Sequence, residues 1–206
     1  MIYVVGTGPG KDDMMTIAAR QLIDKAEILV GWPRLLSLFP DFQGERVEMP
    51  GNIDQTMQYL ARCLSRDVVV LASGDPMLFG IGKRICQHFQ PHERQVVPGI
   101  SSIQMLFSEV GLDMNNLYIS SSHGKLPDFD FLFAHDKVAL VTDKHLGPFE
   151  IAQQARLRQL ERTFIIGENL GYSEQRIWML QADQVQRSYD MNVVVVLNER
   201  GSDERQ

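Results

Sequence analysis

The stretch IYVVGTGPG, residues 2–10, joins a short β-branched run to a loop in which positions 6, 8 and 10 are glycine. A run of this length and composition predicts a buried strand. The glycines predict flexible backbone at its carboxyl end, which in a parallel sheet is the edge where ligands usually bind. The stretch therefore predicts an α/β fold with a ligand site that begins in this loop.

The rest of the first half repeats the alternation of strands and helices. Further strand-like runs lie at residues 27–30, 68–72 and 95–97. Between them, Ile53, Met57 and Leu60, continued by Ala61 and Leu64, recur at helical spacing and predict a stripe that faces the core. Either residue 52 or residue 54 can cap this helix. Alternation of this kind predicts a mainly parallel sheet with crossover helices.

The second half has a different pattern after a junction. A helical pattern that starts at Ile103 should end at Gly111, and turn-forming residues fill positions 111–116. Beyond them we expect strands at 117–120, 138–142, 163–166, 176–180 and 193–197, with one strong helix at 149–160. Neighbouring strands without a helix between them predict hairpins and a mixed sheet. We therefore expect α/β domains at residues 1–112 and 113–198, and a flexible tail at 199–206.

Two more glycine-bearing loops follow strands in the first half, namely SGDPMLFGIG at 73–82 and PGISS at 98–102. Three such loops at one sheet edge favour a shared binding crevice. A dinucleotide fingerprint is the first alternative for residues 6–10, but Lys11 stands where that motif needs a small residue, and Pro9 distorts the turn. Nicotinamide binding is thus the weaker hypothesis, and a tight turn without a ligand stays open.

The composition excludes several classes of function. With Lys+Arg 20 and Asp+Glu 26, the formal charge of −6 gives no basic field for nucleic acid. The apolar runs have the length of strands, so no membrane span is expected. The first residues lack the pattern of a secretory leader, which predicts a cytoplasmic protein. Cys63 and Cys86 fit neither a disulfide scaffold nor paired metal ligands, and the histidines form no cluster, so no metal site is expected.

The three loops, in this order, resemble the tetrapyrrole methylases, an S-adenosylmethionine-dependent family. In the second half, SSSHGK at 120–125, VTD at 141–143 and GENLG at 167–171 are similar to the branch that methylates carbon 5 of cobalt-precorrin-7 in cobalamin biosynthesis. This branch commonly has Arg where Lys125 stands, and lysine keeps the charge of that position but lacks the planar fork of the guanidinium. The resemblance implies two α/β domains with the cofactor in the cleft between them.

The resemblance also implies which residues bind S-adenosylmethionine. Pro9 and Gly10 would form the floor of the pocket. The residues that would line it are Gly74, Asp75, Leu78, Ser101, Ser102, Thr142, Asp143, Asn169 and Leu170. The structural alternative for Asp75 is an Asx-turn, and for the positions in the second half it is a turn at the end of a strand.

The substrate implied is a cobalt-containing corrinoid that carries many carboxylates, which an acidic protein must bind with placed cations. Lys11 and Lys125 are the candidates, and His123 is the candidate for accepting a proton from the ring, because its ordinary pKa lies near neutrality. Solvated lysines and a structural loop histidine are the alternatives.

Further expectations concern alternative functions and the partners of the protein. The target can be another ring carbon, or a protein or RNA. The chain can instead be a nicotinamide-dependent oxidoreductase or a ligand-binding subunit without catalytic activity. The resemblance implies a separate decarboxylating carbon 15 methyltransferase as a partner. We also expect a homo-oligomer.

Overall fold

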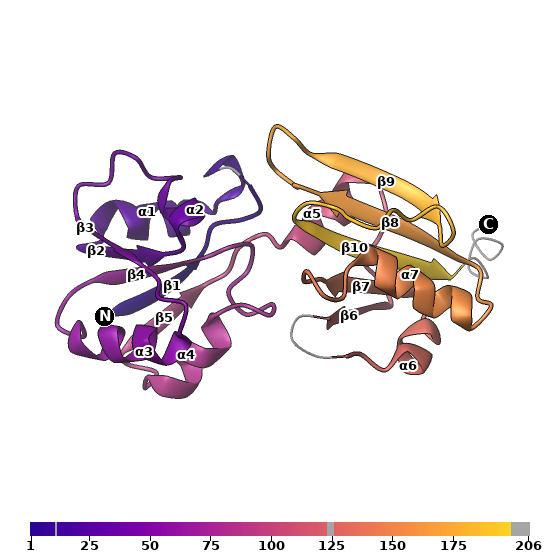
Figure 1. The fold of residues 1–206 in the computed structure, drawn as a ribbon. Helices are drawn as coiled ribbons and strands as arrows, with labels where there is room; N and C mark the ends of the chain where they lie inside the picture. Colours follow the sequence, from indigo (N-terminus) through magenta and orange to yellow (C-terminus); the bar gives the residue numbers. More distant parts are fainter. Residues whose placement is uncertain (11, 123–125, 199–206) are drawn as a thin grey trace. The chain divides into compact units, whose positions relative to one another are not determined.

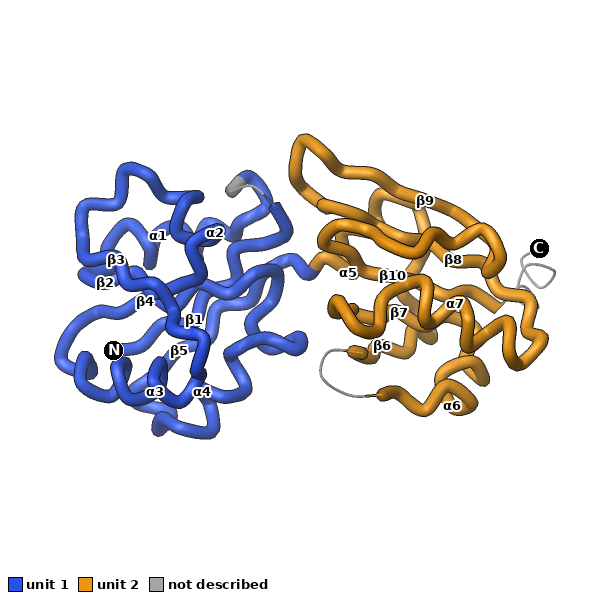
Figure 2. The backbone as a smooth tube through the Cα atoms, in the orientation of Figure 1, with its two compact units in different colours: residues 1–101 blue, residues 102–206 orange. Residues whose placement is uncertain are grey.

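The computed structural model describes residues 1–10, 12–122 and 126–198. The chain divides into two compact units, Met1–Ser101 and Ser102–Gln206, which Figure 2 shows in blue and orange. Each unit is built around its own five-stranded sheet. Lys11, His123, Lys125 and the expected tail at 199–206 lie outside the described residues.

The sheet of the first unit is entirely parallel, with the order β3-β2-β4-β1-β5 (Figure 1). Its strands are β1 Ile2–Gly6, β2 Ile28–Gly31, β3 Glu45–Glu48, β4 Val68–Ala72 and β5 Arg94–Val97. Strand β1 pairs with β4 on one side and with β5 on the other. Residues 68–72 are all buried, as expected for a strand covered on both faces.

Helices cover both faces of this sheet. They are α1 Ile17–Lys25, α2 Pro33–Leu36, α3 Ile53–Arg62 and α4 Gly82–His88, with a 3₁₀ turn at Asp12–Met14. Residues of α1 and α2 share a core with Val5 and Leu71, whereas residues of α3 and α4 share another with Val4 and Val70. Because side chains alternate along a strand, neighbouring residues of β1 and β4 serve opposite cores.

Helix α3 confirms part of the predicted stripe. Asn52 is the cap, since its side chain accepts a hydrogen bond from the Asp54 amide at 2.9 Å. Met57 and Leu60 are buried, as the spacing predicts. Ile53 is exposed instead, because it is the first residue of the helix. Ala61 is also exposed, so the stripe is narrower than predicted.

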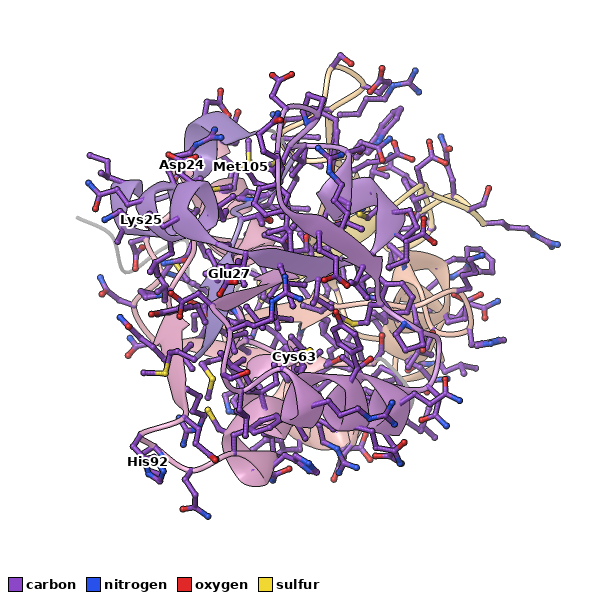
Figure 3. All side chains as sticks on the ribbon, turned by 90° about the vertical axis from the view of Figure 1, so that its left-hand side faces the viewer. Asp24, Lys25, Glu27, Cys63, His92 and Met105 are labelled. Carbon is purple, nitrogen blue, oxygen red and sulfur yellow. The ribbon has the colours of Figure 1, made fainter. Side chains whose placement is uncertain are left out.

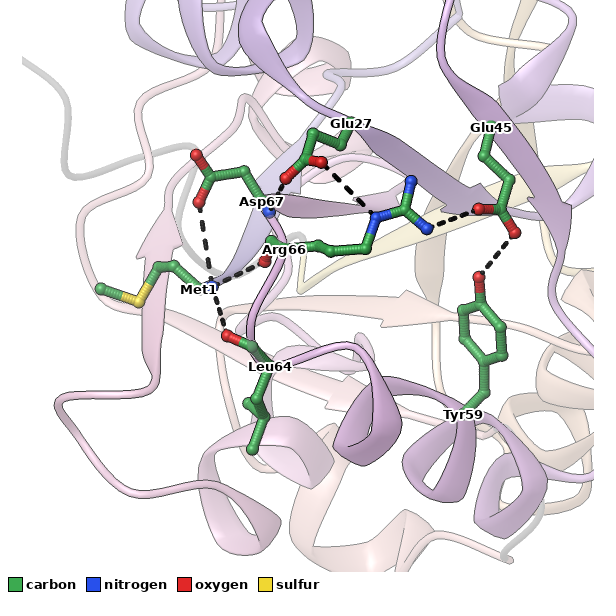
Figure 4. A network of polar contacts seen from close by, with 7 residues as sticks. All are labelled: Met1, Glu27, Glu45, Tyr59, Leu64, Arg66 and Asp67. Atoms are coloured by element: carbon green, nitrogen blue, oxygen red, sulfur yellow. Dashed lines mark hydrogen bonds and ion pairs between the residues drawn. The ribbon is translucent and has the colours of Figure 1, made fainter.

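The amino-terminal edge of the first sheet is closed by a polar network (Figure 4). The Arg66 guanidinium lies 2.8 Å from Glu45 Oε2 and 3.5 Å from Glu27 Oε1. Glu45 also accepts a hydrogen bond from the Tyr59 hydroxyl at 3.1 Å. The hydrogen bond from Arg66 lowers the pKa of Glu45, and burial raises the pKa of Tyr59. Residues before β1, β2 and β4 and at the start of β3 are thereby joined.

The sheet of the second unit is mixed, with the order β6-β7-β10-β8-β9. Its strands are β6 Leu117–Ser121, β7 Lys137–Val141, β8 Arg162–Glu168, β9 Arg176–Gln181 and β10 Asn192–Asn198. Only the β6 and β7 pair is parallel, and the other pairs are antiparallel. Helix α6, Phe129–Phe133, connects the parallel pair, and α7, Pro148–Leu157, connects β7 to β8. The predicted mixed sheet is confirmed.

The division of the chain differs from the expected one. Helix α5, Ser102–Glu109, belongs to the second unit, so the division falls at residue 101 rather than at residue 112. The reason is packing, because α5 packs against β7 and the Leu106 side chain lies against Gly167 of β8. Gly111 does follow α5 in the left-handed conformation, with φ 67°, as predicted for the end of that helix. The turn there marks the end of a helix and not the junction between units.

No helix among the described residues is long and apolar enough to cross a membrane.

Candidate active site

The three glycine loops of the first unit lie next to one another. They follow β4, β1 and β5, which are neighbours in a parallel sheet, so the loops leave from the same edge. The loops after β1 and β4 are joined by a backbone bridge in which the Gly74 amide donates to Gly8 O at 3.0 Å. The Thr7 amide donates to Ala72 O at 2.9 Å. The predicted convergence of glycine loops is therefore present within this unit.

Glycine is required where these loops touch. A Cβ atom at Gly6 would lie 2.5 Å from Gly74 O and 2.6 Å from the Gly99 nitrogen. A Cβ atom at Gly99 would overlap the Gly74 carbonyl oxygen. No side chain fits between backbones at this separation. Gly74 also has φ 64°, a conformation that glycine adopts at little cost.

Two of the loops lead to opposite faces of the sheet. The chain passes from β1 to α1 on one face, whereas it passes from β4 to α4 on the other. Adjacent parallel strands whose connections leave in opposite directions form a topological switch point, which is the usual ligand site of such sheets. The switch point here lies between β1 and β4, where the Gly8 and Gly74 bridge is found.

Asp75 joins two of the loops through its carboxylate. Oδ1 accepts a hydrogen bond from the Met77 amide at 2.7 Å, and Oδ2 accepts one from the Gly99 amide at 3.1 Å. The first bond is the Asx-turn named above as the structural alternative. The second connects the loop after β4 to the loop after β5. Asp75 thus fixes the shape of this edge.

The other residues singled out in the first unit lie on the same loops. Pro9 and Gly10 are buried, and Gly10 has φ 75°. Leu78 is half-buried and its amide donates to Asp75 O at 3.3 Å. Ser101 is buried at the end of the first unit, and Ser102 begins α5 in the second. Lys11 follows Gly10 but lies outside the described residues.

The candidates of the second unit also gather at one sheet edge. Because β10 runs antiparallel to β7 and β8, its first residue lies at the edge where those two strands end. Thr142 follows β7, and its hydroxyl donates to Asn192 at the start of β10, with Oδ1 at 2.8 Å and O at 3.1 Å. Asn169 follows β8, and its amide donates to Met191 O at 2.8 Å. The structure thus brings Thr142 and Asn169 to one segment.

That segment, residues 190–192, was not singled out in the sequence. The Asp190 amide donates to Glu168 Oε1 at 2.6 Å, and the Asn192 side-chain amide donates to Asp190 O at 2.7 Å. Glu168 is buried and also accepts a hydrogen bond from Trp178 Nε1 at 3.3 Å. The only sequence signal is a pair of turn-forming residues before a strand, which is common in loops.

The remaining candidates of the second unit have local structural roles. Asp143 Oδ1 accepts hydrogen bonds from the amides of His145 and Leu146, at 2.8 and 2.9 Å, which makes a turn before α7. Leu170 is buried against Gly167, and Asn169 is left-handed with φ 49°. His123 and Lys125 lie outside the described residues, directly after Ser122, which donates to Leu146 O at 2.7 Å.

Among the residues that the structure describes, no three or more histidine, cysteine, aspartate or glutamate side chains are grouped so that they could hold a metal ion.

Comparison with known proteins agrees with this geometry. The family model of the Tetrapyrrole (Corrin/Porphyrin) Methylases matches residues 1–186. The cobalt-precorrin-7 C(5)-methyltransferase of Salmonella typhimurium is 43% identical over 97% of this chain and 100% of its own length. The decarboxylating precorrin-6Y C(5,15)-methyltransferase of a Sinorhizobium species is 28% identical over 82% of this chain, which spans 44% of that protein.

A solved structure has the same fold over nearly the whole chain. It is the precorrin-6Y methylase of cobalamin biosynthesis from Archaeoglobus fulgidus, with a TM-score of 0.78, 25% identity, and coverage of 96% of this chain and 98% of that one. Its likeness extends over both units, and the family model covers the three glycine loops. The chain therefore belongs to the tetrapyrrole (corrin/porphyrin) methylases.

Proposed function

We propose that the protein is the S-adenosylmethionine-dependent methyltransferase that methylates carbon 5 of cobalt-precorrin-7 in cobalamin biosynthesis. The observation that carries the proposal is the 43% identity to the Salmonella enzyme of that name, over the full length of that enzyme. The three joined glycine loops agree with it, because they are the elements on which the family resemblance rests.

The loops fit a ligand that contains a nucleoside and an amino acid. Gly8, Gly10 and Gly74 are left-handed and carry no side chain, so these loops present backbone at the carboxyl edge of the sheet, where ligands of such folds bind. Backbone groups and hydroxyls are the donors and acceptors that a ribose and an α-amino acid need. S-adenosylmethionine, the methyl donor of this family, supplies a methyl group on a good leaving group.

The protein then has to position the reactants and exclude water. We assign binding of the methyl donor to loop residues of both units. They are Pro9, Gly10, Gly74, Asp75, Leu78, Ser101, Ser102, Thr142, Asp143, Asn169 and Leu170. Asp75 and Asp143 act through the shape of their loops, because the carboxylate of each accepts hydrogen bonds from backbone amides.

Substrate binding is assigned to Lys11 and Lys125, and the removal of a ring proton to His123. Replacing His123 by Ala should lower methyl transfer far more than it lowers the affinity for S-adenosylmethionine, because the imidazole would act only on the substrate. His145→Ala is the matched control, since that histidine is exposed on the turn before α7. Unchanged turnover of the His123→Ala protein would exclude the proton-transfer role.

The decisive experiment locates the methyl group. Purified protein is incubated with cobalt-precorrin-7 and S-adenosylmethionine that carries a ¹³C-labelled methyl group, and the product is examined by NMR. Label on carbon 5 supports the proposal, and label on another carbon assigns a different ring position. Calorimetric titration with S-adenosylmethionine and with NADH tests the rival class, because an oxidoreductase would bind NADH.

We also propose that the protein acts beside a decarboxylating carbon 15 methyltransferase. The Sinorhizobium relative carries both positions in its name, and this chain spans 44% of it. Two separate proteins should then act in sequence on one intermediate. Mixing them with cobalt-precorrin-7 and S-adenosylmethionine should give a product methylated at both carbons, and accumulation of the singly methylated product would contradict this proposal.

A further inference from the structure

The exposed large apolar side chains of the first unit are distributed unevenly. Every one among its described residues lies between the carboxyl end of a strand and the first residue of the next helix, and all five strands contribute. We call this set the apolar rim. Its members are Ile17, Trp32, Ile53, Met77, Phe79 and Ile100, which are between 36% and 77% exposed.

The opposite edge of the same sheet is polar. Figure 3 looks onto the side of the molecule where Asp24, Lys25 and Glu27 are found, at the end of α1 and before β2. The ion pairs from Arg66 to Glu27 and Glu45 lie at this edge (Figure 4). The two ends of one sheet therefore have opposite chemistry. Exposed large apolar side chains gathered at one end of a sheet point to a binding surface there.

Phe79 is the member of the apolar rim with the least favourable backbone conformation. Its φ is 57°, in the left-handed region that bulky residues rarely adopt, and 51% of it is exposed. Among the described residues, its ring has no aromatic or cation–ring contact. Strain of this kind persists at functional sites, where the surrounding structure enforces it. The conformation therefore makes Phe79 a candidate for a functional side chain.

The surrounding turn holds Phe79 in this position. A Cβ atom at Gly80 would lie 2.7 Å from Pro76 O, and one at Gly82 would lie 2.6 Å from the same oxygen. The Gly82 amide donates to Pro76 O at 2.9 Å, so residues 76–82 form a closed turn. Asp75, at the start of this turn, is fixed by its bonds to Met77 and Gly99. A tightly closed turn leaves the ring of Phe79 on its outer side.

Cations accompany the apolar side chains. Arg34, two residues after Trp32, is exposed, and its Nη2 donates to Ser73 Oγ at 3.3 Å. Lys83 is exposed on the first turn of α4, close in sequence to Phe79. Exposed apolar side chains with cations beside them are complementary to a planar ring system that has carboxylates around its margin.

We propose that the apolar rim is the surface that receives one face of the macrocycle, and that Phe79 stacks on that face. The proposal rests on the proposed function, since it takes a carboxylated tetrapyrrole as the substrate. Phe79 is then a residue that positions the substrate, and its strained backbone is what directs the ring toward it. Met77, which is 52% exposed in the same turn, extends the contact.

The test uses Phe79→Gly and Phe79→Tyr. Glycine accepts the left-handed backbone without strain, so Phe79→Gly removes the ring and should not lower the melting temperature. We expect its KM for cobalt-precorrin-7 to rise about tenfold, as for loss of one desolvated aromatic contact, with the Kd for S-adenosylmethionine within twofold of wild type. Phe79→Tyr keeps the ring and should keep the KM.

Other results would overturn the proposal. An unchanged KM in Phe79→Gly removes the ring from the substrate site. A raised Kd for S-adenosylmethionine instead assigns the ring to the methyl donor, and a changed oligomeric state assigns it to an interface. A second measurement is independent of turnover: titration with cobyrinic acid, a carboxylated corrin, should show the same loss of affinity. Wild-type protein that binds this corrin but transfers no methyl contradicts the proposed function, and the titration then still decides the role of Phe79.

Discussion

Asp75 shows how one side chain can shape a site through bonds to the backbone. Both of its carboxylate oxygens accept hydrogen bonds from backbone amides, one in its own turn and one in the loop after β5. Hydrogen bonds to an ionised acceptor are stronger than neutral ones. The Asp75 carboxylate therefore holds the loops after β4 and β5 together. The affinity for any ligand bound to those loops depends on this carboxylate indirectly.

Replacing Asp75 by Ala should weaken S-adenosylmethionine binding and also destabilise the fold. Loss of the two bonds leaves two amides without their acceptor, which should lower the free energy of unfolding by about 1 to 3 kcal/mol. Calorimetry and urea denaturation measure the two effects. Asp75→Asn is the control, because its carbonyl can still accept one of the bonds. Wild-type affinity and stability in Asp75→Ala would contradict the role assigned to the carboxylate.

At the level of loops and strands, the site depends on backbones that approach more closely than side chains allow. Gly6 at the end of β1 meets Gly74 and Gly99 of the loops after β4 and β5 at one point. In the second unit, Thr142 and Asn169 meet the segment at residues 190–192 in a comparable way, through hydrogen bonds. These contacts join elements that are distant in the sequence.

Gly99→Ala should destabilise the first unit, because the added methyl group would overlap the Gly74 carbonyl oxygen. Overpacking of this kind costs about 1 to 3 kcal/mol. Gly51→Ala is a matched control in the same unit, since no atom lies within 4 Å of its added methyl group. Thermal unfolding of both proteins measures the difference. Equal melting temperatures would show that the loops can separate without cost.

Asn192 should be coupled to Thr142. If Asn192→Ala and Thr142→Val remove the same interaction, the double variant should lose less stability than the sum of the single variants, by about 0.5 kcal/mol or more. The distance of 2.8 Å between Thr142 Oγ1 and Asn192 Oδ1 is the physical reason. Urea denaturation of the four proteins gives the coupling free energy. Strict additivity would show that the loop after β7 is held by other contacts.

The whole molecule is acidic, and its stability should depend on pH through carboxylates that are ion-paired in the folded state. A hydrogen bond from Arg66 lowers the pKa of Glu45 below 4.5, and one from Lys137 lowers the pKa of Asp113 below 3.8. A carboxyl group whose pKa is lower in the folded state stabilises the fold above its unfolded pKa. That contribution is lost as the pH falls through the folded pKa.

The free energy of unfolding should therefore be steady from neutral pH down to about pH 5 and should fall below it. Urea denaturation at a series of pH values measures this. Arg66→Ala removes the cause of the Glu45 shift, so its loss of stability on acidification should be smaller than that of wild type. The Glu45 and Arg66 side chains are partly exposed, so salt screens their interaction. The difference in pH dependence between wild type and Arg66→Ala should therefore decrease in 1 M NaCl. The same pH profile in both proteins would contradict the assignment.

The amino-acid sequence alone determined the elements that have a local signal. The buried strands β1 and β4 and the end of α5 before Gly111 follow from β-branched runs and helical spacing, whereas the choice of Asn52 over Asp54 as the cap of α3 came from the structure. The resemblance carried by the three loops identified the family. Strand β3 was missed, because this edge strand reads ERVE and has no apolar run.

Only the tertiary structure decided which distant residues meet. It assigned α5 to the second unit, joined Asp75 to Gly99, and placed residues 190–192 beside Thr142 and Asn169. It also placed the exposed side chains of the apolar rim at one sheet edge and Phe79 in the left-handed region. None of these has a local pattern, because strand order and loop packing depend on interactions between segments far apart in the chain.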